Sequence, residues 1–142
     1  MRIHFALFTA AIGVATLLSG SAVEANEQAE KKAVETAEAW LALVDAGEIG
    51  KSWETAAALF KGAVTREQWE QTVPAVRGPL GKVESRQLAG ASFETSLPGA
   101  PDGEYVVIQF DTVFENKASA VETVTPMRDP DGEWRVSGYF IK

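Results

Sequence analysis

The chain has no cysteine, and its single histidine, His4, lies near the N-terminus. Without cysteine there can be no disulfide bond and no thiol nucleophile. The lack of histidine after His4 also excludes Ser-His catalytic pairs and the usual Cys/His zinc sites from the rest of the chain. We therefore expect no metal and no cofactor, and a fold that is stabilised by side-chain packing alone.

Basic residues are in the minority, with 13 Lys and Arg against 20 Asp and Glu and a formal net charge of −7. They are spread along the chain, whereas phosphate binding depends on clustered Lys and Arg side chains. This distribution argues against nucleic acid and against anionic membrane surfaces as partners.

The N-terminus has the layout of a secretory signal peptide: Arg2, then an apolar run from Phe5 to Leu18, then small residues up to Ala25. The apolar run is about 14 residues long, short of the roughly 20 that a membrane-spanning helix needs. We expect cleavage after Ala25, with Ala22 as the alternative. The product, residues 26–142, would be one periplasmic or secreted domain without a stable membrane anchor.

Three helices are predicted in the first part of this domain. Apolar residues recur at spacings of three and four over residues 26–46, which is the period of an amphipathic helix. A second helix is expected over residues 52–61. A capping-box pattern formed by Thr65 and Gln68 opens a third, in which Pro74 predicts a kink or an early stop.

After Gly81 the apolar period changes from 3.6 to 2, and four strands are predicted, separated by turn-forming residues. Their short connections imply antiparallel hairpins. Helices followed by strands indicate an α+β fold, with N-terminal helices packed on one face of a four-stranded antiparallel sheet. The expected strands are Lys82 to Phe93, Glu104 to Phe114, Ala118 to Met127 and Glu133 to Ile141.

Alternation along the strands predicts which side chains face the helices. On the second strand Val106, Ile108 and Phe110 share one side, and Asp111 lies on the other. The last strand is expected to turn an apolar row inward and a polar row outward, and we expect Trp134 to be the central core residue. The apolar row is Trp134, Val136 and Phe140, and the polar row is Arg135, Ser137 and Tyr139.

Several motifs, spread from the first predicted helix to the last strand, carry a family resemblance. They include Trp40-Leu41-x-Leu43-Val44-Asp45-x-Gly47, Arg77-x-Pro79-Leu80-Gly81, Leu97-Pro98-Gly99-x-Pro101-Asp102-Gly103-x-Tyr105, Phe110-x-Thr112-x-Phe114-x-Asn116-Lys117 and Trp134-Arg135-Val136-Ser137-Gly138-Tyr139. Together they resemble an uncharacterised bacterial family, the domain of unknown function numbered four-zero-one-nine. The resemblance implies an exported single domain and supplies no catalytic residue. The order of elements is also similar to cystatin-like and nuclear-transport-factor-like cones, although a fold does not imply a function.

Two arginines are candidate ligand contacts. Arg77 and Arg86 bracket the turn between the last predicted helix and the first strand, where they could hold a carboxylate bidentately. The alternative is a structural role, in which they bind loop carbonyls or a buried acid such as Asp45 or Asp111.

The polar side of the sheet supplies the other candidates. If this side lined a cavity, Asp111 could act as a base beside Tyr105 or Tyr139 as hydrogen-bond donor, as in acid–base enzymes with cone-like folds. The alternative is a solvated face with cross-strand charge pairs, which would also include Arg86, Gln109, Glu122 or Thr123, and Arg135.

The sequence therefore favours a non-catalytic module of the bacterial envelope that binds either an unknown envelope protein or a small ligand. One alternative is an isomerase-like enzyme of the cone-fold type that uses Asp111. The other is a structural or oligomerisation module.

Overall fold

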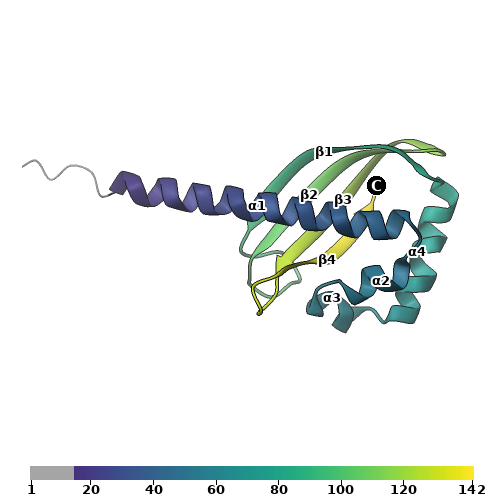
Figure 1. The fold of residues 1–142 in the computed structure, drawn as a ribbon, viewed down its shortest axis with the longest axis horizontal. Coiled ribbons are helices and arrows are strands. Elements are labelled where there is room, and N and C mark those ends of the chain that lie inside the picture. Colours follow the sequence, from purple (N-terminus) through teal and green to yellow (C-terminus); the bar gives the residue numbers. More distant parts are fainter. Residues whose placement is uncertain (1–14) are drawn as a thin grey trace, which may run out of the picture.

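The computed structural model describes residues 15–142, and the side chains of residues 21–142. Arg2 and most of the predicted signal segment lie outside the described residues. Figure 1 shows helices packed against one curved sheet. The elements in chain order are α1 (Ala15–Asp45), α2 (Ile49–Glu54), α3 (Ala58–Ala63), α4 (Arg66–Leu80), β1 (Val83–Glu94), β2 (Tyr105–Phe114), β3 (Lys117–Arg128) and β4 (Trp134–Ile141).

Helix α1 crosses the sheet, and its N-terminal part projects beyond the sheet's end (Figure 1). Ala33, Ala37 and Leu41 are fully buried, and their spacing of four residues places them on the side that faces the strands. The predicted cleavage point at Ala25 lies in an exposed part of α1, before the first buried residue. Among the described residues, no helix is long and apolar enough to cross a membrane.

The region predicted as one helix over residues 52–61 forms two short helices, α2 and α3. The chain leaves the helical path between them because the main-chain N–H of Ala57 donates to the carbonyl oxygen of Val136 on β4, at 2.8 Å. This bond ties the helical layer to the side of β4.

Helix α4 begins as predicted, with a complete capping box between Thr65 and Gln68. The early stop expected as one outcome at Pro74 does not occur, because the helix continues through Pro74 and Pro79 to Leu80. Pro74 is exposed, so water can satisfy the carbonyl group that loses its N–H partner at this position.

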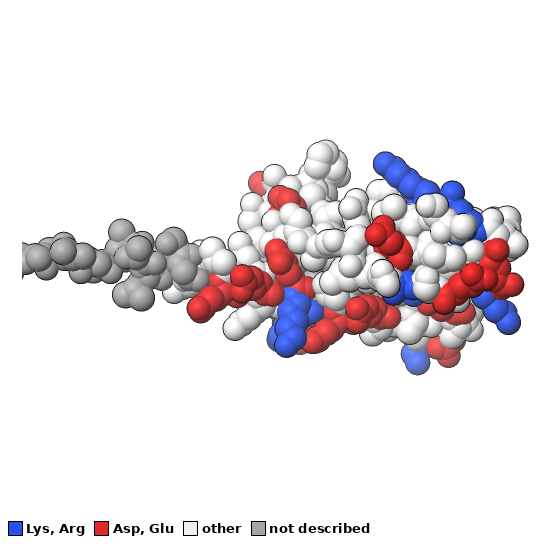
Figure 2. Space-filling model, turned by 90° about the horizontal axis from the view of Figure 1, so that it is seen from above, with Lys and Arg blue, Asp and Glu red and all other residues white. Residues whose placement is uncertain are grey.

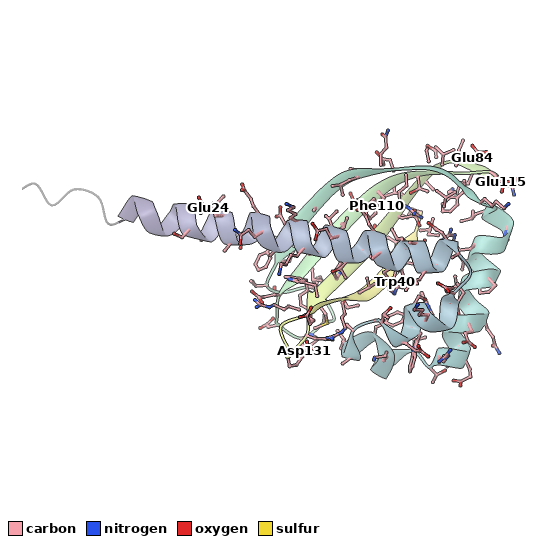
Figure 3. All side chains as sticks on the ribbon, viewed as in Figure 1. Glu24, Trp40, Glu84, Phe110, Glu115 and Asp131 are labelled. Atoms are coloured by element: carbon pink, nitrogen blue, oxygen red, sulfur yellow. The ribbon has the colours of Figure 1, made fainter. Side chains whose placement is uncertain are left out.

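The four strands form one antiparallel sheet in the order β1-β2-β3-β4, which confirms the predicted α+β fold. We call the face covered by helices the inner face and the opposite face the outer face. Figure 3 shows the side chains of Trp40 and Phe110 between α1 and the sheet, where the buried core lies. The core is formed mainly by Ala33, Ala37, Trp40, Leu41, Val44, Phe60, Trp69, Val73, Val106, Ile108, Phe110, Val124 and Val136.

A bulge in β4 overturns the alternation predicted for this strand. Val136 pairs with Pro126 and Gly138 pairs with Thr125, which leaves Ser137 as an extra residue. A one-residue shift moves every following side chain to the other face. Tyr139 is therefore on the inner face, whereas Phe140 points outward and is 51% exposed.

Trp134 is also not the centre of the core. It is half-buried and packs against the edge of the core, whereas Trp40 is only 3% exposed.

Candidate functional site

Five polar side chains from different elements meet beneath α1, at the end of the sheet nearest α4. We call this set the inner cluster. It consists of Asp45 at the end of α1, Arg77 on α4, Arg86 on β1, Glu122 on β3 and Tyr139 on β4.

Glu122 is the most deeply buried member, with an exposed fraction of zero. Its Oε1 accepts hydrogen bonds from Arg86 Nε at 2.7 Å and from Thr112 Oγ1 at 2.6 Å. Its Oε2 accepts a hydrogen bond from the hydroxyl group of Tyr139. Both carboxylate oxygens thus have partners, which a buried acid requires.

Asp45 is held by both arginines. Arg77 Nη2 lies 2.7 Å from Asp45 Oδ1, and Arg86 donates through Nη1 to Oδ2 at 2.7 Å and through Nη2 to Oδ1 at 3.2 Å. A negative charge at the C-terminal end of a helix is disfavoured by the helix dipole. The two guanidinium groups counteract this cost and fix the end of α1 to β1 and α4.

The surroundings shift three pKa values in the cluster. Burial works against the ionised form of Asp45, but hydrogen bonds from Arg86 and Arg77 outweigh it and lower the pKa of the carboxyl group. Burial also opposes the charge of Arg86, yet its bonds to Asp45 and Glu122 raise its pKa. Burial, and then the proximity of Glu122, raise the pKa of the Tyr139 hydroxyl. Near neutral pH Tyr139 is therefore a hydrogen-bond donor and not a phenolate nucleophile.

Of the five candidate residues proposed from the sequence, the structure brings three together: Arg77, Arg86 and Tyr139. Asp111 is exposed on the outer face, so the sheet separates it from Tyr139. Tyr105 shares that outer face but lies six residues away on the same strand, roughly 20 Å along the sheet. Asp111 therefore has neither tyrosine beside it.

Tyr105 has a structural role that the sequence did not indicate. Its side chain is 1% exposed, and its hydroxyl group donates to the carbonyl oxygen of Pro101 at 2.6 Å. The tyrosine thus fixes the loop between β1 and β2.

Asp45 was expected from the sequence only as a possible structural partner of the arginines, and it has that role. Glu122 was expected on the polar side of the sheet, but it is buried on the inner face. A signal for Glu122 exists, because it shares its alternation phase on β3 with the buried residues Ala120 and Val124. A carboxylate in an apolar row requires a cationic partner. Sequence does not show which arginine supplies it.

A groove next to the cluster is lined mostly by apolar side chains. We call it the α4–β4 groove, after the two elements that form its walls. Its volume is about 230 Å³, and it lies beside the exposed side chains of Val76 and Phe140. Arg77 and Tyr139 provide its polar side. The lining residues are Trp69, Thr72, Val73, Val76, Arg77, Tyr139, Phe140 and Ile141.

Outside the inner cluster, Asp129 is the one buried charged residue among those that the structure describes, and Arg135 binds it at 2.9 Å. Figure 2 shows acidic side chains along the first part of α1, with a smaller basic group among them. Within residues 15–142, no group of three or more acidic side chains is arranged to hold a metal ion.

We expect the inner cluster to make stability depend on pH in the acid range. The pKa of Asp45 is lowered in the folded state, so its ionised form stabilises the fold. This contribution is complete above the unfolded-state pKa of about 3.9 and is lost as the pH falls through the folded-state value. Urea unfolding of wild type and Asp45→Asn between about pH 6 and pH 2 measures it, and the variant should be less stable at pH 6 with a flatter decline.

Asp102→Asn is the control, because Asp102 is an exposed acid in a loop. Its curve should follow wild type throughout. Parallel curves for wild type and Asp45→Asn would show that the Asp45 carboxylate gains nothing from the arginines.

Comparison with known proteins identifies a family but no characterised relative. No curated protein and no solved structure matches the chain. The model of the family described as "Protein of unknown function (DUF4019)" matches residues 36–139, which contain the whole inner cluster. Since this match spans more than half of the sequence, the chain belongs to that family, as its motifs predicted.

Proposed function

We propose that this domain is a non-catalytic binding module of the bacterial envelope, and that its recognition surface is the α4–β4 groove. The observation that carries the proposal is the groove itself, which combines apolar walls with a few convergent polar groups. Val76 and Phe140 lie beside it with 48% and 51% of their surfaces exposed. Ligand sites usually have this composition.

The size of the groove favours a side chain of a partner protein over a free small molecule. Pockets for drug-sized ligands measure roughly 300–1,000 Å³, whereas the groove encloses about 230 Å³. It therefore suits a single large apolar side chain.

The state of the inner cluster supports a role without catalysis. Asp45 and Glu122 are engaged by arginines, and the raised pKa of Tyr139 keeps its hydroxyl protonated. An acid–base catalyst needs a group whose pKa lies near the working pH and that can reach a substrate. A network that is hydrogen-bonded within itself serves better to fix the helices against the sheet, and so to hold the walls of the groove.

The assignment to the envelope rests on the signal-like N-terminal sequence. The described side chains of residues 21–28 are exposed, and the first buried residue is Ala33. Cleavage after Ala25 would therefore remove none of the buried core.

The dye 1-anilinonaphthalene-8-sulfonate tests whether the groove accepts an apolar group. We expect a saturable fluorescence increase with wild-type protein, and an affinity lowered about fivefold or more by Val76→Glu, since the carboxylate would have to be desolvated at the groove wall. Leu88→Glu is the matched control, because Leu88 on β1 is 49% exposed and lies outside the groove.

Equal dye binding by wild type and Val76→Glu would contradict the proposal. An affinity lowered to the same extent by Leu88→Glu would do so as well, because the dye would then bind to apolar surface in general.

A further inference from the structure

One wall of the groove is the outer edge of a sheet. β4 is the last strand in the sheet order and pairs on one side only, with β3. Such an edge presents unpaired N–H and C=O groups, which are a template for another strand.

The hydrogen-bond register identifies the groups that face away from β3. Lys142 and Val121 exchange both of their main-chain hydrogen bonds, each at 3.0 Å. Bonded and non-bonded pairs alternate along an antiparallel ladder. The main chain of Phe140, which pairs with Thr123, therefore bonds to β3. The main-chain N–H and C=O groups of Tyr139 and Ile141 point away from β3, at the free edge of the sheet.

The two halves of this edge differ. In the first half, the carbonyl oxygen of Val136 accepts a bond from Ala57, so the α2–α3 connection covers the edge there. Among the described residues, no element covers the second half in this way, and Tyr139 and Ile141 both line the α4–β4 groove. The free part of the edge and the groove are thus one surface.

The charge at this surface favours a partner that carries an acidic residue. Arg77 is the one charged residue among those that line the groove, and it is paired with Asp45. At the rim, the exposed ammonium group of Lys142 lies 5.9 Å from the centre of the Phe140 ring.

We propose that the occupant of the groove is an extended polypeptide segment of a partner protein, which adds to β4 as a fifth strand. The proposal rests on the proposed function and names the class of partner. The segment bonds to the main chain of Tyr139 and Ile141, places one large apolar side chain between α4 and β4, and carries an acidic residue next to Lys142. Main-chain bonds supply affinity and the pocket supplies specificity, as in other cases of strand addition.

A random octapeptide library displayed on phage tests this proposal. It is selected on wild-type protein and counter-selected on Val76→Glu. We expect enriched peptides that combine one large apolar residue with a nearby acidic residue, and that bind Val76→Glu about tenfold more weakly and Leu88→Glu unchanged.

Peptide N-methylation separates strand addition from simple apolar docking, whereas Ile141→Pro also replaces a side chain that lines the groove and so tests both together. Proline at position 141 removes an N–H that points away from β3, and an edge strand tolerates this. Since one hydrogen bond is lost, we expect roughly threefold to tenfold weaker binding. N-methylation of the peptide amides that face β4 should weaken binding at least as much, and it does not depend on how the protein variant folds.

The proposal is overturned if no peptide is enriched over the Val76→Glu background. It is also overturned if selected peptides bind Ile141→Pro and accept N-methylation without loss. A groove-specific dye response together with a failed selection would leave the proposed function in place and remove strand addition alone. If the groove-specific dye response and the peptide selection both fail, the proposed function and strand addition are both contradicted.

Discussion

Arg86→Met is expected to lower the free energy of unfolding by about 3–5 kcal/mol, because it leaves a buried acid without its cation. Glu122 is fully buried and lies 2.7 Å from Arg86 Nε. Arg86 also holds Asp45, so the substitution loosens the end of α1 as well. Urea unfolding at pH 7 measures the loss.

Two further variants define the cause. Arg128→Met removes an ion pair with Glu104 in which both side chains are nearly half exposed, and it should cost at most about 1 kcal/mol. The double variant Arg86→Met with Glu122→Gln should recover part of the loss, because the amide is easier to bury than an unpaired carboxylate. Equal losses for Arg86→Met and Arg128→Met would contradict the burial of this pair.

Trp40→Ala is expected to cost a similar amount, about 3–5 kcal/mol, through lost burial and the cavity that remains. The ring of Trp40 lies 6.0 Å from that of Trp69 and 5.3 Å from that of Tyr139, measured between ring centres. Its Nε1 donates to the carbonyl oxygen of Ser52 at 2.8 Å. The variant therefore also leaves a buried carbonyl group without this partner.

Trp134→Ala is the matched comparison for this measurement. We expected Trp134 to be central from the sequence, but the structure shows it half-buried at the edge of the core. Its replacement should cost clearly less than that of Trp40. A larger loss of unfolding free energy for Trp134→Ala than for Trp40→Ala would mean that the main stabilising contacts lie near the β3–β4 turn, where Trp134 begins β4.

Local sequence signals predicted most of the architecture. The four strands lie within a residue or two of their expected bounds, because alternation and turn residues act over short distances. The capping box at Thr65 was also predictable from the sequence, because it requires only the hydrogen bonds between Thr65 and Gln68. The single helix expected over residues 52–61 was wrong because a contact with distant β4 interrupts it.

The inner cluster could be predicted only in part. Arg77 and Arg86 were expected to bind loop carbonyls or a buried acid such as Asp45 or Asp111, and Asp45 is their acidic partner, although its side chain is 30% exposed. The contact between Arg86 and Glu122 depends on the pairing of β1 with β2 and of β2 with β3, and single-sequence patterns do not determine such register. The groove was not predicted, since its walls are brought together by tertiary packing.

The extra residue in β4 reverses the alternation of inward and outward side chains for the rest of the strand. Before Ser137 the inward side chains occupy one phase, and after it they occupy the other. If the sequences of family members are aligned by hydrophobic alternation alone, Phe140 is matched to residues that occupy the position of Tyr139 in the structure. Relatives are therefore best superimposed in two blocks, joined at the serine whose hydroxyl group donates to the carbonyl oxygen of Thr125 at 2.7 Å.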